Sequence, residues 1–134
     1  MLNPFPELLT YSLLAPFLLR ITLGFILVNL GYLKFKSEKA RWEIIFEMLR
    51  VKEKVVATKI LGFIEVAGGL ALIAGFYTQI AALIFAVLFG IELFIEKREA
   101  TLMKRDVVFY ATMFVIALSL LFSGAGFLAF DLPL

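Results

Sequence analysis

Eight polar or charged side chains lie inside, or at the edges of, apolar stretches of this 134-residue chain. A charge at the centre of a bilayer-spanning helix costs about 2.5–3.5 kcal/mol on insertion scales. Such residues are therefore expected to form ion pairs, to pack between helices or to have a functional role. Carboxylates can exchange protons, while lysine and tyrosine can donate hydrogen bonds to a ligand oxygen. The candidate ligand-binding residues are Arg20, Asn29, Tyr32, Lys34, Glu65, Glu92, Asp106 and Tyr110.

Two residue types that are common in catalytic, redox and metal-binding sites are absent from the chain. It contains no cysteine, which excludes disulfides, CxxC redox motifs and clusters ligated by cysteine. It contains no histidine, which removes the usual haem ligand and the commonest metal ligand and general base. We therefore expect no metal site and no intrinsic cofactor, and no catalytic residue can be assigned.

The composition indicates an integral membrane protein. Hydrophobic residues make up 63% of the chain, compared with about 45–50% in soluble domains. Apolar runs of the length that spans a bilayer predict an all-α bundle of four transmembrane helices in a single domain, residues 1–134. Pro16 either kinks the first helix or marks its start after a short interfacial segment. The predicted spans are residues 8–33, 57–76, 78–95 and 107–123.

Small residues recur on the same helix faces as the charges. Rows of this kind let helix backbones approach closely in lipid. The charges should therefore point into the bundle and form a polar seam, meaning a row of polar side chains between the helices. The residues expected to pack helices together are Gly24, Gly31, Gly62, Gly68, Gly69, Gly75, Ala82, Ala86 and Gly90.

Lysine and arginine predict the orientation in the membrane. Residues 34–59 carry eight of them and residues 96–106 carry four, whereas the other expected loops and the termini carry none. Basic loops stay in the cytoplasm. We expect a multi-pass protein of the plasma membrane with both basic loops cytoplasmic and both termini outside. The modest net charge of +2 does not suggest a nucleic-acid partner.

The first basic loop contains an amphipathic pattern. Trp42, Ile45, Phe46 and Leu49 follow helical spacing, which predicts an interfacial helix over residues 37–56 with Trp42 at headgroup level. Such a helix would either cover the end of the bundle or act as a lid over an opening between the helices.

Depth along the helices suggests partners for Glu65. At 1.5 Å per residue, Arg20 lies roughly 21 Å from Lys34, whereas Glu65 lies about 9 Å from Lys59 at the same end of the bundle, so an Arg20–Glu65 pair would have to close an axial gap of about 12 Å. Asn29, Tyr32 and Lys34 are expected to lie closer. Whether Arg20 pairs with Glu65 stays open at this point.

The order of these residues resembles the DoxX family of small four-helix membrane proteins. The chain departs from that pattern at Leu30, where many members carry histidine. The resemblance covers almost the whole chain and rests on Arg20-x3-Gly24-x6-Gly31-x2-Lys34, Glu65-x2-Gly68-Gly69-x5-Gly75, Asp106 and Gly124-x-Gly126-x4-Asp131.

The resemblance implies a subunit or accessory of a membrane quinone-linked oxidoreductase, with a redox protein as partner. Because the chain has no cysteine or histidine, we do not expect it to turn over alone. Lys34, Tyr32 and Tyr110 would donate hydrogen bonds to a quinone, Glu65 or Asp106 would pass protons, and Trp42 would cap the opening. Two alternatives remain: a non-enzymatic adaptor or lipid-binding protein, and a small proton-coupled transporter. Self-association is also left open.

Overall fold

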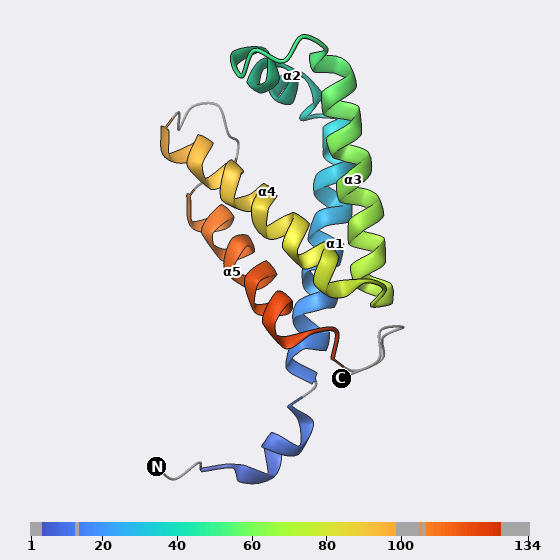
Figure 1. Ribbon diagram of the computed structural model, residues 1–134, viewed down its shortest axis with the longest axis vertical. Coiled ribbons are helices and arrows are strands. Elements are labelled where there is room, and N and C mark those ends of the chain that lie inside the picture. The colour runs from blue at the N-terminus through green and yellow to red at the C-terminus, as the bar shows by residue number, and fades with distance from the viewer. Residues whose placement is uncertain (1–3, 13, 99–104, 106, 127–134) are drawn as a thin grey trace.

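The computed structural model describes residues 4–12, 14–98, 105 and 107–126, and its regular structure there is entirely helical (Figure 1). A short 3₁₀ helix precedes five α-helices. The elements are η1 (Pro6–Tyr11), α1 (Leu14–Phe35), α2 (Lys39–Met48), α3 (Lys54–Ala74), α4 (Thr78–Arg98) and α5 (Val107–Ser123).

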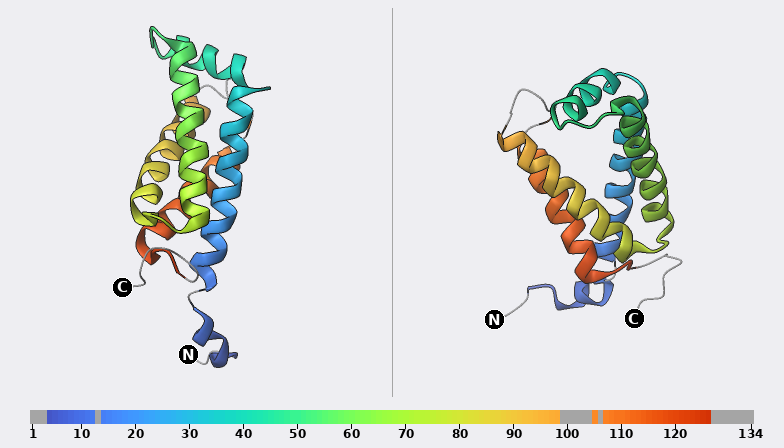
Figure 2. Two further views of the ribbon diagram at one scale, coloured as in Figure 1. Left: turned by 90° about the vertical axis from the view of Figure 1, so that its right-hand side faces the viewer. Right: turned by 45° about the horizontal axis from the view of Figure 1, so that its top comes forward.

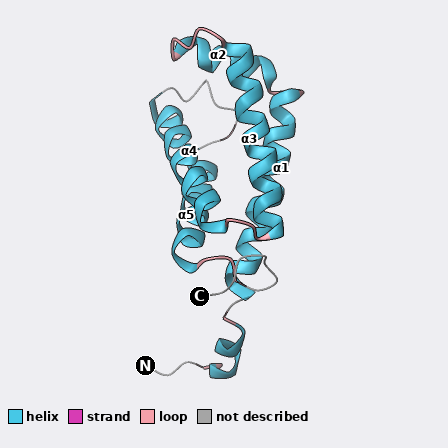
Figure 3. Ribbon diagram, turned by 45° about the vertical axis from the view of Figure 1, so that its right-hand side comes forward, coloured by secondary structure: helices cyan, strands magenta, loops and turns pink. Residues whose placement is uncertain are grey.

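The long helices form two pairs. α1 packs along α3, and α4 packs along α5 (Figures 2 and 3). The pairs meet at the end of the molecule where α3 turns into α4, and they diverge toward the opposite end (Figure 1). The short helix α2 lies at that diverging end, so the bundle is tight at one end and splayed at the other.

Glycines allow the backbones of α1 and α3 to touch. A Cβ atom added at Gly24 would lie 2.7 Å from the carbonyl oxygen of Gly69, and one added at Gly31 would lie 2.6 Å from that of Gly62. Any side chain at these positions would meet backbone, which cannot move aside. This contact therefore fixes the rotation of α1 against α3.

The other small residues contact further helices, except for Gly75, which ends α3. The ring of Phe85 on α4 occupies the space that a side chain at Gly68 would need. Ala82 and Ala86 are buried in the apolar core. Gly75 ends α3 in the left-handed conformation, with a φ of 76°, which glycine adopts without steric cost.

The predicted spans correspond to α1, α3, α4 and α5, with shifted ends for the first three. The first span was expected over residues 8–33, but η1 takes up its start and Pro16 lies in the first turn of α1, where proline is tolerated. α1, α3 and α4 are each long and apolar enough to cross a membrane. α5 is an apolar helix of 17 residues with the predicted bounds.

The helix expected over residues 37–56 is shorter in the structure. α2 ends at Met48, and Arg50 adopts a left-handed φ of 62° before α3 begins. The chain must reverse within these few residues to bring α3 alongside α1, and a continuous helix could not do so. Trp42 and Ile45 are buried, so Trp42 faces the protein, and its depth at headgroup level stays a prediction.

Candidate functional site

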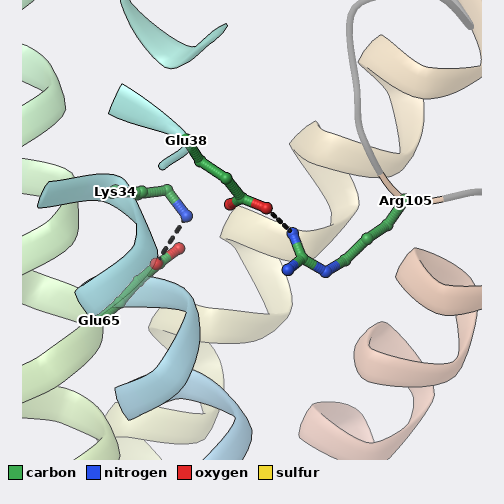
Figure 4. Close-up of polar contacts among 4 residues, drawn as sticks. All are labelled: Lys34, Glu38, Glu65 and Arg105. Carbon is green, nitrogen blue, oxygen red and sulfur yellow. Dashed lines mark hydrogen bonds and ion pairs between the residues drawn. The ribbon is translucent and has the colours of Figure 1, made fainter. Parts of the chain in front are cut away.

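A buried ion pair joins α1 to α3 at the splayed end of the bundle. The Lys34 ammonium donates a hydrogen bond to Glu65 Oε2 at 2.7 Å, and both side chains are 2% exposed (Figure 4). Each of these residues follows a contact glycine, Gly31 or Gly62, by one helical turn and therefore lies on the same helix face. The close approach of the two backbones thus places the charges opposite each other.

Trp42 covers this pair from α2. The Lys34 Nζ atom lies 4.3 Å from the centroid of the indole ring, which is within the range of a cation–π interaction. The ring is buried, with 6% of the residue's surface exposed. Lys34 is therefore held between a carboxylate and an aromatic face.

A second ion pair lies beside the first and links the two helix pairs. Arg105 Nη1 donates to Glu38 Oε1 at 2.8 Å, with Glu38 2% exposed and Arg105 22% exposed (Figure 4). Glu38 directly precedes α2, and Arg105 lies just before α5 next to the ring of Phe109. This pair connects segments that lie far apart in the sequence.

α4 and α5 contribute two more polar side chains. Glu92 is 5% exposed and Tyr110 is 3% exposed. Glu92 lies within electrostatic range of Glu65 and Lys34, and Tyr110 lies within range of Arg105. We define the polar cluster as Lys34, Glu38, Glu65, Glu92, Arg105 and Tyr110.

The chemistry open to the polar cluster follows from its composition. Three carboxylates face two cations, which suits proton exchange and the binding of a polar headgroup. Within the described residues no set of histidine, cysteine, aspartate or glutamate side chains is arranged to hold a metal ion. A hollow of about 300 Å³ lies elsewhere, on the outer side of α5, among Ala111, Thr112, Val115 and Ile116.

The family model DoxX matches residues 15–95, from the first turn of α1 into α4. The chain belongs to the DoxX family. A search of curated proteins and a search of solved structures each found no match.

Membership of the DoxX family and the long apolar helices together indicate a membrane protein. The matched range contains the two motifs that carry the resemblance in the first half of the chain, from Arg20 to Lys34 and from Glu65 to Gly75. It also contains both members of the Lys34–Glu65 ion pair. Asp106 and the motif at the end of the chain lie outside the matched range.

Two candidate residues of this DoxX protein lie away from the polar cluster. Tyr32 is 56% exposed and Asn29 is also exposed, so Lys34 is the one of the three residues expected to lie closer that pairs with Glu65. That expectation rested on depth along the helix alone. Successive residues turn by about 100° around the axis, and this turn places both side chains off the Lys34 face.

Arg20 lies toward the other end of α1. It is fully buried and its guanidinium lies 5.4 Å from the centroid of the Phe17 ring. The distance of roughly 21 Å along the helix that separates it from Lys34 keeps it out of the polar cluster, and Glu65 pairs with Lys34 instead. Asp106 lies outside the described residues.

Glu38 and Arg105 were not among the residues singled out from the sequence. Both occur in segments that read as basic loops, and Arg105 served only as a marker of orientation. One signal was available: Glu38 is the first acidic residue of the segment 34–59 and follows Lys34 by about one helical turn. Its partner depends on how the helix pairs meet, which no local pattern encodes.

Proposed function

We propose that this DoxX protein spans the plasma membrane four times, with residues 34–59 and 96–106 in the cytoplasm and both termini outside. The twelve lysines and arginines in those two segments support this orientation. The length of α5, 17 residues, is at the lower limit for a span. In this arrangement the polar cluster lies toward the cytoplasmic side.

Cysteine labelling tests this topology directly, because the natural chain has no cysteine. Single cysteines replacing Lys52 and Gln79, both exposed, should show opposite behaviour in intact cells. We expect a membrane-impermeant maleimide to label the variant at 79 and to label the variant at 52 only after the cells are opened. Labelling of the variant at 52 from outside intact cells would contradict the proposed orientation.

We propose further that the polar cluster holds the headgroup of a quinone, and that the protein is a subunit or accessory of a membrane quinone-linked oxidoreductase. The observation that carries this proposal is the Lys34–Glu65 pair, buried under Trp42 where the two helix pairs diverge. A quinone site needs hydrogen-bond donors next to an apolar environment that leaves the isoprenoid tail in lipid.

The donor set fits such a headgroup. The Lys34 ammonium has three N–H groups and uses one for Glu65. Tyr110 and Arg105 add donors from the other helix pair, and Glu65 and Glu92 are positioned to exchange protons. A quinone would supply the electron chemistry, and this chain would orient the headgroup and manage its protons. A redox partner is expected because the chain has no cysteine or histidine for a redox centre of its own.

Quinone binding by purified protein tests the headgroup site. We expect ubiquinone or menaquinone analogues to raise the melting temperature of the parent protein. Lys34→Met should abolish this effect and Glu65→Gln should weaken it, because these changes remove a donor and a proton acceptor. Gln79→Ala, at the opposite end of the bundle, is the matched control and should bind as the parent does. If no analogue binds or stabilises the parent, the headgroup site is wrong.

The alternative is a non-enzymatic adaptor or lipid-binding protein, and one observation favours it. The Lys34–Glu65 and Glu38–Arg105 pairs satisfy four charged groups within the chain itself. Two ion pairs that neutralise each other's charges can hold two helix pairs together without any ligand. Purification in mild detergent, followed by identification of bound lipids, quinones and proteins, separates the two functions.

A further inference from the structure

α2 contacts both helix pairs at the splayed end of the bundle. On one side, Trp42 lies against Lys34 of α1. On the other side, Glu38 at the start of α2 binds Arg105, which precedes α5 (Figure 4). The ten residues of α2 therefore bridge the gap between the pairs at the level of the Lys34–Glu65 ion pair.

The contacts of α2 differ in strength. Two further ion pairs of α2 between described residues, Lys39–Glu43 and Lys54–Glu47, involve side chains that are 22–64% exposed, and exposed pairs contribute little to stability. The Glu38 carboxylate is 2% exposed, so loss of Arg105 would leave a buried charge without this partner, at a much larger cost. The Glu38–Arg105 pair should therefore contribute more to the position of α2 than its exposed ion pairs do, in addition to the buried side chains of Trp42 and Ile45.

We infer that α2 is a lid over the Lys34–Glu65 pair and that the Glu38–Arg105 ion pair is the latch that holds the lid closed. Release of the latch lets Trp42 leave Lys34 and opens the ammonium to an incoming ligand oxygen. The inference rests on the proposed headgroup site, because the lid controls access to that site.

Trp42 is the only tryptophan in the chain, so its fluorescence reports the position of α2 without a label. In Glu38→Gln and in Arg105→Gln, we expect the acrylamide quenching constant of Trp42 to rise roughly twofold or more, since a weakened latch increases the population of the open state. Glu43→Gln removes a carboxylate from the same helix but not from the latch. This matched control should be quenched like the parent.

A cross-link tests the same inference without relying on the stability of those variants. Cysteines at positions 38 and 105 remove the ion pair and can be joined by a short bismaleimide in a chain that has no other cysteine. Before cross-linking, quenching should exceed that of the parent, and after cross-linking it should fall to the parental value or below. Parental quenching in both glutamine variants, or no effect of the cross-link, would overturn the lid.

The lid and the headgroup site can fail separately. The quenching measurements need no quinone, so a lid that opens in Glu38→Gln stands even if the parent binds no quinone. If quinone binds and quenching does not respond to the latch variants, the headgroup site stands and the lid is wrong. If both hold, quinone should associate faster with Glu38→Gln than with Glu43→Gln.

Discussion

Leucine in place of Glu65 should strongly destabilise the protein, because it leaves the Lys34 ammonium buried without its carboxylate. The pair is 2% exposed and has an N–O distance of 2.7 Å. Removal of one member of a buried charge pair costs about 3–5 kcal/mol. We expect Glu65→Leu to lower the yield of folded protein and its melting temperature in detergent. The matched control is Glu43→Leu, which removes a more exposed carboxylate from α2 and should cost much less.

The double variant Lys34→Met/Glu65→Leu sharpens this prediction. Replacing a whole buried ion pair by apolar side chains is often neutral or stabilising. The double variant should therefore recover much of the stability that Glu65→Leu loses, even though it carries one more substitution. If Glu65→Leu melts like the parent, or if the double variant is no more stable than the single one, the ion pair does not have the energetic role assigned to it.

Alanine in place of Gly31 should also be strongly destabilising, although alanine favours helices over glycine by about 1 kcal/mol. The new Cβ would lie 2.6 Å from the carbonyl oxygen of Gly62 and 2.9 Å from the backbone nitrogen of Val66. Neither atom can move without shifting α3. Overpacking of this kind costs about 1–3 kcal/mol, and it would also pull Lys34 away from Glu65.

Gly90→Ala is the matched control, because it makes the same chemical change in another long helix. A Cβ at Gly90 would lie 3.4 Å from the Phe114 ring, which is ordinary contact. This variant should unfold at or above the parental temperature, whereas Gly31→Ala should unfold below it. Equal stability of Gly31→Ala and Gly90→Ala would contradict the close backbone contact between α1 and α3.

The helices and their inner faces could be predicted from the sequence because they depend on local patterns. The apolar run that became α5 has the predicted bounds, 107–123. Helical periodicity placed Gly24, Gly31 and Lys34 on one face of α1, and all three are buried there. Small residues and charges on a shared face are informative in a membrane protein because the lipid-facing side gains nothing from them.

The partners within the polar cluster could not be predicted in the same way. Depth along a helix placed Tyr32 and Lys34 equally well near Glu65, and only the rotation of α1 against α3 distinguishes them. The Glu38–Arg105 pair depends on how two helix pairs meet, and the length of α2 depends on the reversal at Arg50. Each is set by tertiary packing rather than by residue spacing.

The pairing of α1 with α3 has a consequence for biosynthesis. Chains are made from the N-terminus, so Lys34 is already placed when Glu65 emerges from the ribosome. A carboxylate without a partner in an inserting helix is costly in lipid. The ammonium of Lys34 can pair with the Glu65 carboxylate as α3 inserts. In the proposed four-span topology, insertion of α3 should therefore depend on α1, whereas α4 and α5 can assemble later as a hairpin. Deletion of α1 would then also impair the membrane insertion of α3.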